Sequence, residues 1–232
     1  MIIDVSHWQG DIDWNKVKVD GVIIKACNGK KGVDEKFIRN VNGCYSNGIP
    51  LGFYLYSTAK TEKDAEIETN HFIQTISKYK EIISLPCYID VEEKGTEKAS
   101  AKVVKKFIEI MTANGYNCGV YASDSWYKSY LKGVDIPHKW VARYNTIPPV
   151  TKCELWQFTD KGSVVGIKGN VDCSKDVTIV TTVKPTDEQV AQEVIAGKWG
   201  NGRERRDRLT KAGYNFRKIQ TIVNKLVLKK GV

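Results

Sequence analysis

Four carboxylates occupy positions in the sequence from which they could act together in catalysis. Asp90 and Glu92 follow one apolar run, while Asp4 and Asp172 end two others. Because side chains alternate along a strand, Asp90 and Glu92 point to the same side, with Cα atoms roughly 6.5–7 Å apart. Acids that converge raise one another's pKa, which favours one of them staying protonated. Glycoside hydrolysis needs such a protonated acid beside a carboxylate.

A single Asp-x-Glu pair is usually a solvated strand end, so the hypothesis depends on three strands carrying acids at their carboxyl ends. Aromatic rings near the same strand ends strengthen it, because such rings can stack on sugars. They can equally serve as core, and we expect about half of them to contact substrate. These neighbouring residues are His7, Trp8, Tyr54, Tyr56, Tyr121, Tyr144 and Trp156.

The elements that must position these residues are short strands alternating with helices. Apolar runs typical of buried parallel strands occupy residues 2–5, 21–26, 50–56, 85–91, 118–122, 140–143, 154–158, and 171 with 177–180. Helical spacing occupies residues 34–47, 61–79 and 100–114. The order predicts an α/β fold, an irregular (β/α) barrel of about eight strands with helices missing in its second half. An open doubly wound sheet is the alternative. No GxGxxG or GxxxxGK[ST] motif occurs, which argues against a nucleotide cofactor.

The last fifth of the chain has a different composition. The net charge is +9, and the residues from Lys184 onward hold 12 Lys and Arg against 5 Asp and Glu, or +7. Such a surface attracts polyanions. Residues 188–196, 201–211 and 215–228 read as three short helices. We therefore predict a catalytic barrel over residues 1–182, a linker over 183–187 and a small three-helix module over 188–232.

Several partners and cofactors are excluded by what the sequence lacks. The six cysteines form no CxxC pair and the three histidines are scattered, so we expect free thiols, no metal site and no cofactor. No apolar run is long enough to span a bilayer. The first residues lack a basic segment, which predicts synthesis in the cytoplasm without a signal peptide.

Ordered motifs along residues 1–180 resemble those of the family 25 glycoside hydrolases, the Chalaropsis-type lysozymes, many of which are phage endolysins. The motifs are IDVSHWQG (3–10), VIIKA (22–26), GFY (52–54), YIDVE (88–92), GVY (119–121), WVARY (140–144), LWQF (155–158) and VD (171–172). The resemblance implies an irregular β/α barrel. It also implies an N-acetylmuramidase, which cuts the β-1,4 bond between N-acetylmuramic acid and N-acetylglucosamine.

The resemblance also assigns roles to residues. Glu92 corresponds to the general acid, Asp90 would assist through the acetamido group of the substrate, and Asp4 and Asp172 complete an acidic cleft. The remaining matched positions are expected to bind substrate: Lys25, Tyr54, Tyr56, Tyr121, Tyr144, Trp156 and Gln157. The chain departs from the family at Cys27-Asn28-Gly29, where relatives commonly carry a hydroxyl residue and Glu before the Gly.

The tail resembles the wall-binding repeat named for the Cpl-7 lysozyme, over the motifs KWGNG (198–202) and AGY (212–214). That repeat binds peptidoglycan muropeptide, which makes Trp199, Arg208 and Tyr214 candidate contacts. Trp199 could equally anchor the core of so small a bundle. The resemblance thus predicts an endolysin that leaves the host cytoplasm through a holin pore and acts on the bacterial cell wall.

Two other functions remain open from the residues alone. A chitinase-like hydrolase would also use acids spaced along one strand. A non-catalytic wall-binding protein would use the basic tail, but it has no reason to keep four mutually repelling acids. No nucleic-acid-binding motif occurs, so we expect no nucleic-acid partner and no membrane insertion.

Overall fold

The computed structural model describes residues 1–30, 32–177, 187–211 and 214–229. The chain divides into two compact units, Met1–Thr178 and Ile179–Val232. Two sequence predictions fall partly outside the described residues. They are most of the linker, residues 183–186, and the end of the last apolar run, residues 178–180.

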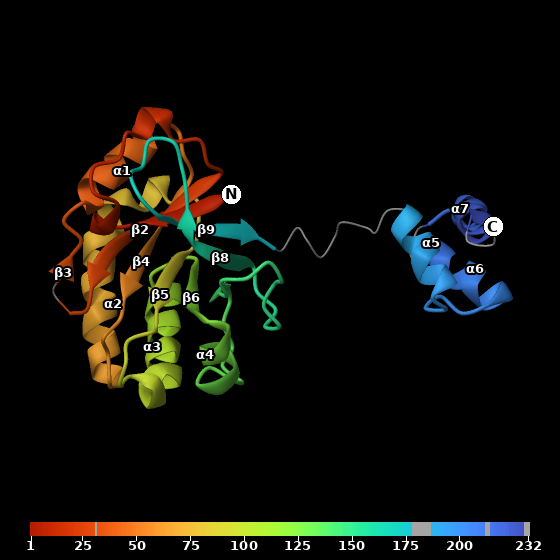
Figure 1. Cartoon of the computed structure of the whole chain (residues 1–232). Coiled ribbons are helices and arrows are strands. Elements are labelled where there is room, and N and C mark those ends of the chain that lie inside the picture. Colours follow the sequence, from red (N-terminus) through yellow and green to blue (C-terminus); the bar gives the residue numbers. More distant parts are fainter. Residues whose placement is uncertain (31, 178–186, 212–213, 230–232) are drawn as a thin grey trace. The chain divides into compact units, whose positions relative to one another are not determined.

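Eight strands of the first unit close into a barrel (Figure 1). Around the ring the order is β1, β9, β8, β7, β6, β5, β4 and β2, and β1 pairs back to β2; the short β3 pairs with β2 alongside it. The bounds are β1 Ile2–Val5, β2 Gly21–Asn28, β3 Gly32–Val33, β4 Leu51–Tyr56, β5 Cys87–Asp90, β6 Cys118–Ser123, β7 Lys139–Ala142, β8 Leu155–Gly162 and β9 Val171–Asp176. The predicted fold class, an α/β barrel, is confirmed.

Strand β9 runs against both of its neighbours. It pairs antiparallel with β1 and with β8, whereas the other described strands of the ring pair in parallel. Asp172 therefore lies near the amino end of its strand, and the prediction of a carboxyl-terminal position was wrong. The reversed direction still brings Asp172 to the edge where the parallel strands end, because Asp4 and Asp172 face each other across β1 and β9.

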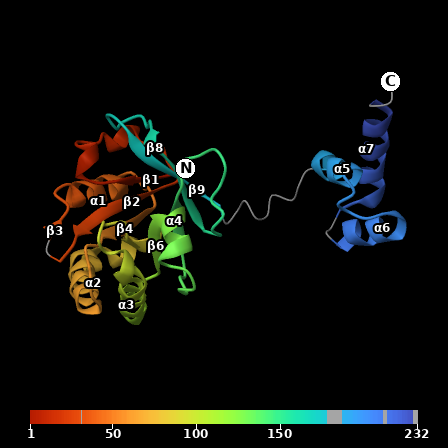
Figure 2. The ribbon, with the colours of Figure 1, turned by 60° about the horizontal axis from the view of Figure 1, so that its bottom comes forward.

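Helices pack on the outside of the barrel strands (Figures 1 and 2). They are α1 Phe37–Ser46, α2 Glu62–Ile76, α3 Ser100–Ala113 and α4 Asp124–Ser129, with 3₁₀ turns at His7–Gln9, Trp14–Lys16, Ser77–Ile82 and Glu97–Ala99. The three predicted helices are confirmed, although residues 77–79 belong to a 3₁₀ turn. Helix α4 was not predicted; Ser123 caps its start, because the Ser123 hydroxyl accepts the Trp126 N–H.

Apolar side chains pack on both faces of the barrel wall. The main core lies between the strands and the helices, and Phe37, Phe53, Phe72 and Phe107 are buried there. A second cluster fills the barrel interior around Trp140, whose indole N–H donates to Ser174 Oγ at 3.0 Å. The rings of Tyr54, Tyr88 and Tyr121 meet Trp140 edge-on. The interior around Trp140 is therefore packed with aromatic and apolar side chains.

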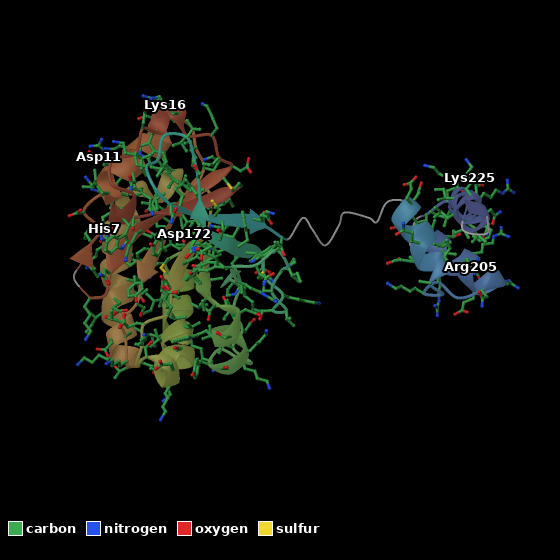
Figure 3. All side chains as sticks on the ribbon, in the orientation of Figure 1. His7, Asp11, Lys16, Asp172, Arg205 and Lys225 are labelled. Atoms are coloured by element: carbon green, nitrogen blue, oxygen red, sulfur yellow. The ribbon has the colours of Figure 1, made fainter. Side chains whose placement is uncertain are left out.

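The second unit is a bundle of three helices, α5 Asp187–Ile195, α6 Gly202–Lys211 and α7 Phe216–Lys229. Its core is small and consists of Val190, Ala191, Val194, Leu209, Tyr214, Ile219 and Val223. Charged side chains project from the same helices, and Figure 3 labels Arg205 on α6 and Lys225 on α7. A core of this size is near the lower limit for independent folding.

All six cysteines are free, five of them buried and Cys153 partly exposed. Burial raises the pKa of the Cys27 thiol to about 11, which keeps it in the unreactive protonated form. Across the described ranges, no helix is both long and apolar enough to cross a bilayer.

Candidate active site

A cavity of about 210 Å³ opens at the mouth of the barrel, above the Trp140 ring. Strands β1, β2, β4, β5, β6, β7, β8 and β9 or the residues directly after them supply its walls. The lining residues are Asp4, Trp8, Lys25, Tyr54, Tyr56, Asp90, Glu92, Tyr121, Trp140, Tyr144, Gln157 and Asp172. Figure 3 shows Asp172 among the strands of the first unit.

The structure brings ten of the eleven residues predicted for this site to the cavity. Trp156 is the exception. Its neighbours in the strand, Leu155 and Gln157, face the barrel interior and the cavity, so alternation turns the indole to the other side of β8. There its N–H donates to the Arg143 carbonyl at 2.8 Å. Sequence reasoning placed Trp8 near the site but omitted it from the substrate-binding set, and it overlooked Trp140.

Gln157 joins three other cavity residues through its side-chain amide. Its Nε2 donates to Asp4 Oδ2 at 2.9 Å, while its Oε1 accepts the hydroxyls of Tyr121 at 2.9 Å and Tyr144 at 3.1 Å. The two phenols fix the amide orientation, so its NH₂ group must face the carboxylate. Burial raises the pKa of Asp4 well above its usual value, and the charge of Asp172 adds to this, whereas the bond from Gln157 lowers it.

Asp90 and Glu92 stand at different depths in the cavity. Asp90 is 5 % exposed, and within the described residues its Oδ1 has no hydrogen-bond partner. Burial raises the pKa of Asp90 well above its usual value, and Glu92 raises it further. Glu92 is exposed as a residue, but its carboxyl group is partly desolvated in the cavity. That desolvation, followed by the charge of Asp172, raises the pKa of Glu92.

Lys25 is a buried cation that faces these acids from β2. It is 8 % exposed, and its positive charge opposes the rise in the pKa of both Asp90 and Glu92. Its Nζ lies 4.7 Å from the centre of the Tyr56 ring, within cation–π range. The Tyr56 hydroxyl in turn donates to Glu93 Oε2 at 2.7 Å, which ties the segment carrying Glu92 to β4. This contact was not predicted, because nothing in the sequence pairs residues 56 and 93.

The carboxylates of the cavity are suited to proton transfer. In the part of the chain that the structure describes, no group of His, Cys, Asp and Glu side chains has the geometry of a metal site. The four carboxylates have raised pKa values, and one stands exposed at the cavity rim. A carboxyl group with a raised pKa keeps its proton to higher pH and can act as a general acid.

The three residues predicted in the tail lie in the second unit. Trp199 packs against the core of the bundle, with its ring edge-on to Tyr214 at 5.9 Å and its N–H donating to Glu193 Oε2. Tyr214 is buried, whereas Arg208 is exposed on α6 and pairs with Glu204 at 2.7 Å. Trp199 therefore packs against this core while part of its surface stays exposed.

Comparison with known proteins places the barrel in a family. The model of the glycosyl hydrolases family 25 matches residues 3–167. The chain belongs to glycosyl hydrolase family 25. A CW_7 repeat matches residues 188–227. Both resemblances predicted from the sequence, to family 25 and to the wall-binding repeat, are confirmed.

Several relatives in the family are lysozymes by name. The autolytic lysozyme of Clostridium acetobutylicum is 33 % identical over 180 residues, which cover 73 % of this chain and 53 % of that protein. The lysozyme of Streptococcus phage Cp-7 is 27 % identical over 216 residues, 80 % of this chain and 59 % of the relative. The modular autolysin LytC from Streptococcus pneumoniae, solved with a synthetic peptidoglycan ligand, is 33 % identical with a TM-score of 0.67, over 75 % of this chain and 45 % of LytC. The chain thus spans about half the length of these relatives.

Proposed function

We propose that this family 25 protein is a lysozyme that hydrolyses peptidoglycan at the β-1,4 bond between N-acetylmuramic acid and N-acetylglucosamine. The observation that carries the proposal is the convergence of Asp4, Asp90, Glu92 and Asp172 on one cavity. Four acids in one place repel each other and cost stability, so their retention fits a catalytic role. The lysozymes among the relatives support the same reaction class.

Glu92 acts as the general acid. Its carboxyl group stands at the rim, where the glycosidic oxygen of a bound glycan can reach it, and its raised pKa keeps it protonated to higher pH than a free glutamate. Proton transfer to that oxygen breaks the bond to the anomeric carbon, while nearby carboxylates stabilise the positive charge that develops on the sugar. Water then adds to the anomeric carbon and gives up a proton to the Glu92 carboxylate, which restores the acid.

Asp90 assists from a deeper position. Its buried Oδ1 lacks a hydrogen-bond partner within the described residues, and buried polar atoms are normally paired. The N–H of a substrate acetamido group can supply that bond and would be oriented by it. Asp4 and Asp172 complete the negative field, and Lys25, Tyr54, Tyr56, Tyr121, Tyr144 and Gln157 line the substrate-binding surface.

The tail completes the function as a wall-targeting module. We propose a catalytic barrel over residues 1–182 and a module over 188–232, with peptidoglycan as the partner of both. Trp199, Arg208 and Tyr214 are the module's candidate contacts, and the exposed Arg208 suits a muropeptide carboxylate. The phage lysozyme among the relatives favours the role of an endolysin that acts on the bacterial wall after holin-type release.

Digestion of purified peptidoglycan tests the bond that is cut. We expect new reducing ends on N-acetylmuramic acid by mass spectrometry, and no product from chitin. Reducing ends on N-acetylglucosamine would contradict the proposed bond. Cleavage of chitin alone would show that the substrate is chitin and not peptidoglycan.

Replacement of the acid tests its role. Glu92→Gln keeps the shape but cannot donate the proton, so lysis should fall at least a hundredfold, as for a positioned general acid. Glu97→Gln, five residues further along and outside the cavity, is the matched control and should keep the parent rate. Lysis by Glu92→Gln within tenfold of the parent chain would remove Glu92 from the mechanism.

A further inference from the structure

Trp8 presents an exposed indole at the rim of the acidic cavity. Among the large apolar side chains that the structure describes, it has the highest exposed fraction, 80 %. A single exposed apolar side chain is ordinary on a protein surface. Trp8, however, lines the same cavity as Asp4, Asp90 and Glu92. Its position beside the acids is what distinguishes it.

The backbone of Trp8 is held by a hydrogen-bonded turn directly after β1. Ser6 Oγ accepts the Trp8 N–H at 3.2 Å, and the Ser6 N–H donates to Gln9 Oε1 at 2.8 Å, which together form a capping box. Gly10 leaves the turn at φ +62°, a conformation that favours glycine. Two hydrogen bonds and a glycine therefore fix the backbone position from which the indole projects.

The imidazole of His7 backs the indole. The ring centroids are 4.6 Å apart, with an angle of 35° between the planes. His7 is itself fixed, because its Nδ1 lies 2.8 Å from Asp34 Oδ2 and its backbone N–H donates to the same oxygen at 3.1 Å. The Asp34 side chain is 1 % exposed, and its other oxygen accepts the Lys36 N–H. Figure 3 shows where His7 lies in the first unit.

We infer that Trp8 is a preorganised platform on which one N-acetylhexosamine ring of the glycan stacks, forming a subsite at the rim on the β1 side of the cavity. The inference rests on the proposed function and names one of its binding positions. A sugar ring presents an apolar C–H face that matches the broad, rigid face of an indole. Because the turn fixes the backbone of Trp8 and His7 contacts its indole, binding pays less to order the ring. The carboxylates below can then hydrogen-bond the polar edge of the neighbouring sugar.

Binding and catalysis are measured separately to test this subsite. The Glu92→Gln chain, which should not cleave, is titrated calorimetrically with soluble peptidoglycan glycan strands freed of their peptides. Adding Trp8→Ala should raise Kd by roughly tenfold to a hundredfold, the range for losing an aromatic anchor. Trp8→Phe, which retains a ring, should lose much less. The control is Tyr45→Ala, which removes a 64 % exposed ring from α1 and should leave Kd unchanged.

The outcomes distinguish the subsite from the reaction. All variants share the same tail, so any glycan bound there contributes equally, and the exposed position of Trp8 should leave thermal unfolding unchanged. A Kd for Trp8→Ala within twofold of its parent, or no measurable binding by the Glu92→Gln chain, overturns the platform. If binding depends on Trp8 but the chain with Glu92 restored releases no muramic acid ends, the platform stands and the proposed reaction fails.

Discussion

Gln157→Met should destabilise the catalytic unit in a way that depends on pH. Methionine has nearly the same length and volume but makes none of the three hydrogen bonds of the amide. Asp4 loses the bond from the amide, which is charge-assisted where Asp4 is ionised and is then worth about 1.5–3 kcal/mol, and the buried Tyr121 hydroxyl is left unpaired at about 1–3 kcal/mol. Tyr144 is 53 % exposed and its hydroxyl can bond to water instead, so the loss of its bond adds little to the change in the free energy of unfolding. We expect a loss of roughly 3–5 kcal/mol in the free energy of unfolding.

The dependence on pH follows from the direction of the Asp4 pKa. The pKa of Asp4 in the folded chain lies above its unfolded value, so the folded state binds more protons, and stability falls as pH rises from the unfolded towards the folded pKa. The bond from Gln157 lowers the folded pKa and thus limits that fall. Without the bond, the difference between variant and parent should grow with pH. At pH 4, where Asp4 is protonated, a neutral bond of about 0.5–1.5 kcal/mol replaces the charged one.

Urea unfolding of the full-length chain at pH 4 and pH 8 measures this difference. The parent is compared with Gln157→Met and with Gln74→Met, a matched replacement of an exposed glutamine on α2 that should stay within about 0.5 kcal/mol. The variant should lose about 1–2 kcal/mol more at pH 8 than at pH 4. An equal loss at the two pH values would show that Gln157 contributes packing alone and does not stabilise the charge on Asp4.

Two further predictions concern the second acid and the tail. Asp90→Asn should lower the rate of peptidoglycan cleavage by roughly two to four orders of magnitude, whereas full activity would remove Asp90 from the mechanism. Pull-down of the full chain on cell walls should weaken with NaCl, because the Debye length is about 8 Å at 0.15 M, but persist at ~0.5 M through specific contacts. At that salt Arg208→Gln should remove most of the binding that remains. If the parent chain already loses its binding at moderate salt, the tail binds the wall by charge alone.

The elements that sequence analysis located well are those with uniform apolar character. Strands β2, β4, β5 and β6 are buried along nearly their whole length, so each appears as a continuous apolar run. The prediction that Asp90 and Glu92 share a face also followed from one local rule, the alternation of side chains along a strand, and both line the cavity.

Sequence analysis did not predict the features that depend on pairing between residues far apart in the chain. β9 reads as a polar segment because Asp172 lines the cavity and Ser174 meets Trp140 inside the barrel, so hydropathy did not reveal its full length or its reversed direction. The bond between Gln157 and Asp4 joins residues 153 positions apart, and no local pattern encodes it. Trp156 and Gln157 were predicted together on the substrate side, although neighbouring residues of one strand face opposite ways.

The acidic cavity lowers the stability of the folded chain, whereas the rest of the fold raises it. Burial is the largest cause of the raised pKa of all four acids, nearby carboxylates raise each pKa further, and Lys25 and Gln157 oppose part of the rise. Each raised pKa means that the folded chain gives up stability as pH increases towards neutrality. Apolar side chains at these positions would remove that cost, as they do lower in the barrel around Trp140. The protein instead keeps the acids where the strands end, and the stability that they cost is supplied by the packed layers on either side of the barrel wall.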